Sequence, residues 1–278
     1  ALLLIAVFFF LPVMAALALS FTDFDIYALG DLQRLRFIGF DNYLQLLQSP
    51  LFWIALGNTA YFVVVGGPLS VAISLGAALL VNSRLTHGSA WFRTALFLPV
   101  VTTLVAVAVV WRYLYHPRYG LLNYGLSLFG VEPIDWLGDP NWAMPAIVIM
   151  AVWKNFGFNM IIFIAGLQSI PTQLYEAARV DGAGAWRQFR HITLPLLGPT
   201  FLFVALMTMI CYFQMFAEPY VMTQGGPANR TLSVVLLMYE EGFRWWNMGY
   251  ASAAAFVLFA LILAATMLQL QLRRRGSS

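Results

Sequence analysis

The sequence predicts an all-α polytopic membrane protein that crosses a lipid bilayer six times. Hydrophobic residues make up 61% of the 278 positions and charged residues only 10%. A soluble domain of this length could not bury so much apolar surface. A helix needs about 20 largely apolar residues to cross the roughly 30 Å hydrocarbon core of a bilayer, and six stretches of the chain meet that requirement.

The expected spans follow one another with short polar intervals between them. They cover residues 1–21, 52–81, 94–115, 143–168, 200–220 and 251–272. The first span could be mistaken for a signal peptide, but it lacks a basic leader and a small-residue cleavage site. The second is long and contains Gly66-Gly67-Pro68, so we expect it to tilt or bend there. No interval is large enough to support a soluble core, so a single membrane domain over residues 1–278 is expected.

Basic residues set the expected orientation, because arginine and lysine in short loops stay on the cytoplasmic side. One set of loops is rich in arginine, with only Glu176 and Asp181 as acidic residues, whereas the other set is acidic on balance. Both termini and the loop over residues 169–199 are therefore expected to be cytoplasmic. The arginines concerned are Arg84, Arg93, Arg179, Arg187, Arg190, Arg273, Arg274 and Arg275.

The sequence lacks the common patterns of catalysis and metal binding. The only lysine, Lys154, lies in an apolar stretch, so the chain has no phosphate loop for nucleotide hydrolysis. H-E-x-x-H and G-x-S-x-G are absent, and the three histidines are dispersed. Cys211 lies in the fifth span and is expected to be a small buried residue. The net charge of +3 follows from the loop arginines and gives no support for nucleic-acid binding.

The polar interval between the fourth and fifth spans has the features of a rigid surface projection. Short helices are predicted over residues 174–180 and 185–191, and Pro195 marks the start of the next span. Gly182 can adopt the left-handed conformation that ends a helix, which costs other residues about 1 kcal/mol or more. Such a projection fits a cleft on another protein. An amphipathic hairpin lying on lipid without a protein partner is the alternative.

The same interval resembles a known signature. The pattern is E-A-A, three residues, G, nine residues and I-x-L-P, matched without a gap by Glu176, Ala177, Ala178, Gly182, Ile192, Leu194 and Pro195. It is similar to the cytoplasmic EAA motif of permease subunits in binding-protein-dependent ABC importers. Five other stretches resemble the sugar permeases of the maltose and glycerol-3-phosphate type. They are F-D-N-Y at 40–43, L-P at 98–99, Y-G-L-L-N at 119–123, L-Q-S-I-P at 167–171 and P-Y-V-M-T-Q-G-G-P at 219–227.

The resemblance implies a type I ABC importer permease that carries a carbohydrate or related solute and is not itself an enzyme. The 169–199 loop would dock as a coupling helix into a separate ATPase, with Glu176 meeting basic partner residues. The chain would bind no cofactor, because ATP and Mg²⁺ would be used by the ATPase. The location would be a bacterial or archaeal cytoplasmic membrane. The implied partners are a second, paralogous permease subunit, two ATP-binding cassette subunits, an extracytoplasmic solute-binding protein and membrane lipid.

Polar side chains inside the spans are candidates for a solute pathway, because a charge at the bilayer centre costs about 3 kcal/mol or more. Amide, ammonium and aromatic groups could hydrogen-bond hydroxyls and stack on pyranose faces. The candidates are Lys154, Asn155 and Asn159 in the fourth span and Thr208, Tyr212 and Gln214 in the fifth. Lys154 could instead satisfy the carbonyls of a broken helix near Gly157, and Thr208 could bond back to its own helix. Asn58 and Thr59 could line the pore or join helices.

Smaller features are predicted on the other side of the membrane. The turn over residues 223–230 contains Gly225, Gly226 and Pro227, and could meet the binding protein, close an outer gate or simply connect two helices. A short interfacial helix is expected over residues 41–47 with Asp41 as its cap. Trp245 and Trp246 are expected at a membrane boundary as anchors.

A competing interpretation is a self-sufficient secondary transporter or an intramembrane enzyme. A transporter driven by protons or sodium ions needs acidic residues within the membrane, and the first four spans contain none. An enzyme needs a catalytic constellation, and none of the searched patterns occurs. Dependence of uptake on ATP and a solute receptor would separate the importer from the secondary transporter.

Overall fold

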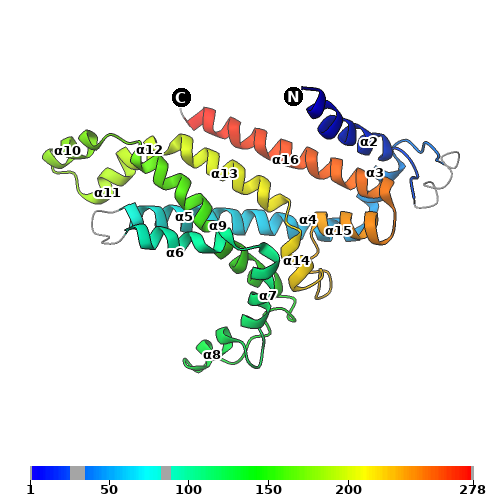
Figure 1. The fold of residues 1–278 in the computed structure, drawn as a ribbon, viewed down its shortest axis with the longest axis horizontal. Coiled ribbons are helices and arrows are strands. Elements are labelled where there is room, and N and C mark those ends of the chain that lie inside the picture. The colour runs from blue at the N-terminus through cyan, green and yellow to red at the C-terminus, as the bar shows by residue number, and fades with distance from the viewer. Residues whose placement is uncertain (1, 26–34, 83–88, 277–278) are drawn as a thin grey trace. The chain divides into compact units, whose positions relative to one another are not determined.

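The computed structural model describes residues 2–25, 35–82 and 89–276, and its regular structure in these ranges is helical (Figure 1). Arg84, which contributes to the predicted orientation, lies outside the described residues. The α-helices are α1 (Leu2–Ile5), α2 (Leu11–Leu19), α3 (Asp41–Gln48), α4 (Pro50–Tyr61), α5 (Gly67–Asn82), α6 (Ser89–Val101), α7 (Leu104–Leu114), α8 (Leu121–Ser127), α9 (Ala143–Gln168), α10 (Thr172–Val180), α11 (Ala185–Gln188), α12 (Leu194–Leu196), α13 (Gly198–Phe213), α14 (Ala217–Met222), α15 (Val234–Tyr239) and α16 (Met248–Gly276). Single π-helical turns are η1 (Ala6–Phe10), η4 (Phe62–Gly66), η5 (Phe189–Thr193) and η6 (Glu240–Arg244).

Three helices among the described residues are long and apolar enough to cross a membrane. They are Pro50–Asn82, Ala143–Gln168 and Met248–Arg273, and they contain or overlap the second, fourth and sixth predicted spans. Two bent pairs bring the number of candidate spans to five if each pair is one span. Trp91–Val101 and Leu104–Leu114 meet at 98°, and Ala185–Leu196 and Gly198–Phe213 meet at 67°. The first predicted span is represented by a shorter apolar helix, Leu3–Leu19, so the crossing number of six stays a prediction.

At Gly66-Gly67-Pro68, where a tilt or bend is expected, the helix contains a π-helical turn. The turn η4 ends at Gly66, and the α-helical repeat resumes at Gly67. Proline has no N–H to donate, and its ring crowds the preceding turn, so a locally widened helix accommodates Pro68 without ending the span. The helix from Pro50 to Asn82 is therefore continuous.

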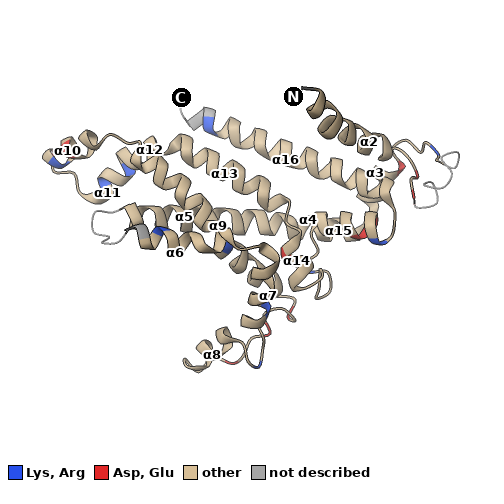
Figure 2. Cartoon of the chain, in the orientation of Figure 1, with Lys and Arg blue, Asp and Glu red and all other residues tan. Residues whose placement is uncertain are grey.

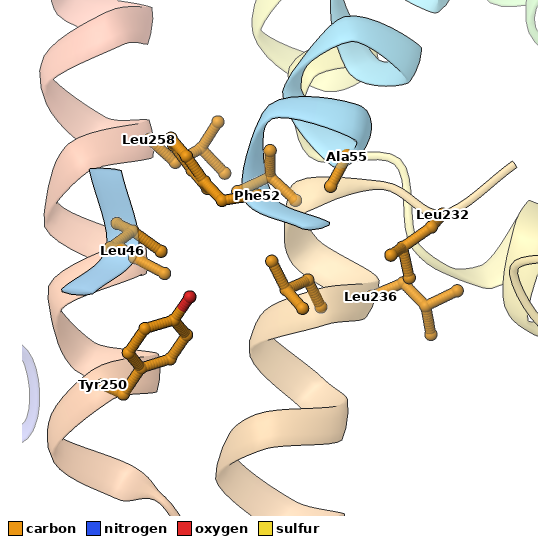
Figure 3. Packing of buried hydrophobic residues seen from close by; sticks show 10 residues of the cluster. Leu46, Phe52, Ala55, Leu232, Leu236, Tyr250 and Leu258 are labelled. Carbon is orange, nitrogen blue, oxygen red and sulfur yellow. The ribbon is translucent and has the colours of Figure 1, made fainter. Parts of the chain in front are cut away.

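The described residues pack as two compact units. The first unit comprises Ala1–Ala60, Leu137–Met144 and Phe213–Ser278. Its core joins side chains from α3, α4, α15 and α16 (Figure 3). The labelled members of this core are Leu46, Phe52, Ala55, Leu232, Leu236, Tyr250 and Leu258. Leucine and aromatic side chains from four separate stretches of sequence thus bury one another, which holds the interfacial helix α3 against α16.

The interfacial helix α3 matches the helix predicted over residues 41–47, but its predicted cap is wrong. Phe40 occupies the N-cap position, no side chain caps the helix, and Asp41 is already its first residue. The anchoring residue is Asn42, whose buried Nδ2 donates to the carbonyl oxygens of Ser20 at 2.9 Å and Thr22 at 2.8 Å. These bonds satisfy carbonyl oxygens at and just beyond the end of α2, where no further helical turn supplies an N–H donor.

The second unit comprises Tyr61–Trp136 and Pro145–Tyr212. Its core is formed by α5, α9 and α13. The buried members are Val71, Ala78, Val81, Met160, Phe163, Ile164, Leu167, Ile170, Leu197 and Val204. Two residues of the 169–199 loop, Tyr175 and Ile192, pack against the edge of this core. The loop is therefore fixed to the helices that carry most of the candidate pathway residues.

Charged residues are sparse on the long helices and gather elsewhere (Figure 2). Figure 2 shows α5, α13 and the middle of α16 almost entirely without charge, whereas α10, α11 and the turn between α15 and α16 carry coloured residues. This distribution agrees with helices that lie in hydrocarbon and connections that lie in water.

Candidate functional site

The signature loop folds as the predicted projection of two short helices. Helix α10 ends in a Schellman motif: the N–H of Ala183 donates to the carbonyl oxygen of Ala178 at 2.8 Å, and the N–H of Gly182 donates to that of Arg179 at 3.1 Å. Gly182 has φ of +74°, so the left-handed conformation predicted for it is confirmed. After the turn, α11 begins at Ala185 and continues through η5 and α12.

Two side-chain hydrogen bonds stiffen the projection. Gln188 Nε2 donates to the carbonyl oxygen of Ala183 at 2.7 Å, which closes the turn between the helices. The hydroxyl groups of Tyr175 and Thr193 lie 2.9 Å apart and join α10 to η5. The Tyr175–Thr193 contact links positions on opposite sides of Gly182, so it fixes the angle between the two helices, whereas the Gln188–Ala183 bond fixes the turn that follows Gly182.

The signature residues divide into an exposed group and an anchoring group. Glu176, Ala177 and Gly182 are exposed on the projection, whereas Ile192 is half-buried against the core of the second unit. Large apolar side chains beside the exposed group also face outward: Val180 is 88% exposed and Trp186 is 69% exposed. Ala178 is half-buried, and Leu194 and Pro195 are exposed. The projection thus combines a carboxylate, small residues and exposed apolar side chains on one surface.

The structure brings three of the predicted pathway residues close to one another in the second unit. Asn159 Nδ2 on α9 donates to Thr208 Oγ1 on α13 at 2.9 Å, and both side chains are buried. Thr208 therefore serves an interhelical bond. One turn further along α13, the ring of Tyr212 stacks on Phe62 with 4.7 Å between centroids. This Tyr212 ring lies against Gly66, where a Cβ atom would come within 2.8 Å of it.

The other pathway candidates lie apart from this group. Asn155 is half-buried on α9, and Gln214 is exposed beyond the end of α13, in the first unit. Cys211 was expected to be buried, and this is wrong: it is exposed. The buried residues of α13 include Val204, Thr208 and Tyr212, one helical turn apart, and Cys211 points away from that stripe.

Lys154 is buried, and its ammonium group reaches a helix break. Its Nζ donates to the carbonyl oxygen of Val100 at 3.2 Å, near the point where α6 ends and the chain bends by 98° into α7. Carbonyl oxygens at the end of a helix have no intrahelical donor, and the end carries a partial negative charge that favours a cation. The contact supports the interpretation that Lys154 satisfies broken backbone carbonyls. Nearby, a Cβ atom on Gly157 would collide with the carbonyl oxygen of Leu96.

The glycine-rich turn is held by two residues for which the sequence left the role open. Asn58 Nδ2 donates to the carbonyl oxygens of Asn229 at 2.7 Å and Leu232 at 2.9 Å. Thr59 Oγ1 accepts from the N–H of Val234 at 3.1 Å. Both therefore join segments of the first unit. Gly225 has φ of +81° and is buried, and Gly226 and Pro227 are half-buried. The exposed residues of the turn are Gln224, Ala228, Asn229 and Arg230.

Comparison with known proteins decides the family. Residues 70–277 match the family described as the inner membrane component of binding-protein-dependent transport systems. The chain belongs to this family. The lactose transport system permease protein LacF of Rhizobium radiobacter is 37% identical over 274 residues, which cover 97% of this chain and 90% of that protein. The trehalose/maltose transport system permease protein MalF of Thermococcus litoralis is 36% identical over 273 residues, which cover 97% and 90%.

A solved structure shows the same fold. A chain of a bacterial ABC transporter involved in the import of the acidic polysaccharide alginate matches this permease with a TM-score of 0.83 at 24% identity, covering 100% of this chain and 93% of that one. The family resemblance predicted from the signature loop is thus confirmed. This permease is a multi-pass inner-membrane component of an ABC transporter and is not itself the catalytic subunit.

Proposed function

We propose that this permease moves a carbohydrate through the membrane as one half of an ATP-driven importer. The observation that carries the proposal is the rigid projection over residues 169–199, which presents Glu176 beside exposed apolar residues on a loop anchored to the helices of the second unit. Relatives with more than a third of their residues identical are named for lactose and for trehalose and maltose, which supports a sugar as the solute.

In the proposed mechanism, the energy comes from two ATPase subunits. Closure of the ATPases on ATP draws the projections of the two permease halves together and opens an outward-facing cavity, a binding protein delivers the solute, and hydrolysis restores the inward-facing state. The projection acts as a lever that biases a two-state equilibrium, and the solute shifts it only by its different affinity for the two states. Both termini and residues 169–199 are cytoplasmic in this proposal, which places the chain in a bacterial or archaeal cytoplasmic membrane with six crossings.

We propose that Asn159, Thr208 and Tyr212 contribute to the solute pathway. An amide, a hydroxyl and a phenol ring on two facing helices are suited to sugar hydroxyls and to the apolar face of a pyranose. The Asn159–Thr208 hydrogen bond keeps both polar groups satisfied when no solute is present. Asn155 and Gln214 are further candidates, and the turn at Gly225, Gly226 and Pro227 is the candidate contact for the binding protein or an outer gate.

The function is tested by uptake in proteoliposomes. The permease is reconstituted with its second permease subunit, the ATPase and the binding protein, and uptake of labelled lactose, maltose and trehalose is followed. Uptake of at least one sugar is expected only when internal ATP and external binding protein are both present. Uptake driven by a proton gradient without ATP would instead establish the secondary transporter.

Replacing Asn159 with leucine is expected to lower sugar uptake roughly five- to tenfold, because a hydrogen bond to the solute contributes about 1 kcal/mol or slightly more. Basal ATPase activity should stay within twofold, since Thr208 can then bond back to its own helix. Ile161→Leu, an exposed position on α9, is the control. Uptake at the wild-type rate by Asn159→Leu would remove Asn159 from the pathway.

A further inference from the structure

Two cavities that share lining residues lie at η6 and at the beginning of α16, and both are lined by the first unit alone. The polar cavity has a volume of about 380 Å³, and its lining includes the polar residues Gln224, Glu240 and Arg244 beside the rings of Tyr220, Tyr239 and Phe243. The apolar cavity has a volume of about 350 Å³, and almost all of its lining is apolar. It is lined by Ala16, Phe216, Val235, Met238, Tyr239, Gly242, Phe243, Met248, Ala251, Ser252 and Ala255. Tyr239 and Phe243 belong to both, so the two cavities share an aromatic wall.

The position of the cavities corresponds to a membrane boundary. The turn η6 (Glu240–Arg244) precedes the apolar span Met248–Arg273, and Figure 1 shows the chain reversing there from α15 into α16. Trp245 and Trp246 between them are exposed, as interfacial tryptophans are. Met248, Ala251, Ser252 and Ala255 follow at helical spacing and therefore line one face of the first two turns of the span. Only 17% of the most apolar stretch of this span is buried by the rest of the chain.

The polar cavity contains one acidic and one basic side chain, Glu240 and Arg244, close to each other. Arg244 Nη1 lies 3.5 Å from Glu240 Oε1, and both side chains remain partly exposed. A guanidinium group binds phosphate in a fork geometry, and a carboxylate beside aromatic faces attracts an ammonium group. The rings form a continuous cluster, with 5.3 Å between the centroids of Tyr220 and Tyr239 and 5.8 Å between those of Tyr239 and Phe243. An anionic headgroup without an ammonium group would be repelled by Glu240, whereas a zwitterion can satisfy both charges.

We propose that these two cavities form a binding site for one zwitterionic phospholipid. The phosphate lies against Arg244, the ammonium group lies between Glu240 and the aromatic wall, and an acyl chain lies in the groove along Ala251 and Ala255. The site is distinct from the candidate solute pathway, because none of the candidate pathway residues lines either cavity. A bound lipid would fix η6 against α2 and α16 and so stabilise the outer end of the span.

The proposal is tested by native mass spectrometry of the purified transporter complex titrated with phosphatidylethanolamine or phosphatidylglycerol of identical acyl chains. The wild type is expected to retain phosphatidylethanolamine at least fivefold better. Ala255→Phe fills the acyl groove and should lower retention severalfold, whereas Ala260→Phe, an exposed alanine on the same helix outside the groove, should not. Glu240→Lys makes the headgroup cavity basic and should reverse the preference toward phosphatidylglycerol.

Each other outcome contradicts the proposal in a defined way. Equal retention of the two lipids by the wild type would mean that the paired charges do not select the headgroup. Equal effects of Ala255→Phe and Ala260→Phe would mean that the groove holds no acyl chain. Binding of maltose or lactose that depends on Glu240, with no lipid retained, would assign the polar cavity to sugar instead. Glu240 is partly exposed, so its variant is expected to fold and to give a readable result.

Discussion

Replacing Glu176 with lysine is expected to abolish ATP-driven uptake while leaving the permease folded. Glu176 is exposed on α10, so the substitution removes no buried contact. If basic residues of the ATPase meet this carboxylate, the variant places like charges face to face, which costs several kcal/mol and weakens docking roughly a hundredfold or more. The measurement is co-purification of the ATPase with the permease, together with uptake in proteoliposomes.

The matched control is Glu132→Lys, which makes the same charge reversal at an exposed position outside the 169–199 loop. Gly182→Trp is a second, independent variant, because Gly182 has φ of +74° and a tryptophan there is strained by about 1 kcal/mol or more while also blocking the docking edge. Wild-type ATPase co-purification and normal uptake with Gly182→Trp would show that the projection does not couple the two proteins.

Replacing Gly157 with leucine is expected to destabilise the second unit by about 3 kcal/mol or more. Overpacking a core usually costs about 1 to 3 kcal/mol, and the cost is highest where the neighbouring atoms cannot move away. A Cβ atom at this position would meet the backbone carbonyl oxygen of Leu96 and would lie 3.1 Å from Val100 Cγ2. Backbone atoms cannot rotate away as a flexible side chain can. Helix α6 would therefore have to move, and the bond from Lys154 to Val100 would be lost.

The measurement for Gly157 is the thermal unfolding midpoint in detergent, compared with that of Gly76→Leu. Gly76 lies within α5 and has open space where its Cβ would be, so the same substitution there adds a side chain without a collision. A midpoint for Gly157→Leu equal to that of the control would show that α6 and α9 do not pack as closely as this geometry requires.

The features that could be predicted from the sequence are those that depend on neighbouring residues. The long apolar helices at Pro50–Asn82, Ala143–Gln168 and Met248–Arg273 follow from uninterrupted apolar composition. The turn at Gly182 follows from local backbone preference, and the structure has it in the predicted conformation. Predicted boundaries were less accurate: the span expected over residues 200–220 begins at Gly198 and its helix ends at Phe213. The break at Thr102–Thr103 was not predicted, because hydropathy does not detect a bend within an apolar run.

The sequence by itself determined that this chain is a membrane permease with a helical projection over residues 169–199, because composition and a gapless local motif carry that information. Only the tertiary structure decided what the polar residues within the membrane do. In the structure, Asn159 donates a hydrogen bond to Thr208, and Lys154 donates one to a carbonyl oxygen near the end of α6. Asn58 donates to the carbonyl oxygen of Asn229, 171 residues away in the sequence. Buried polar groups must find partners, and which partner is near depends on how distant helices pack.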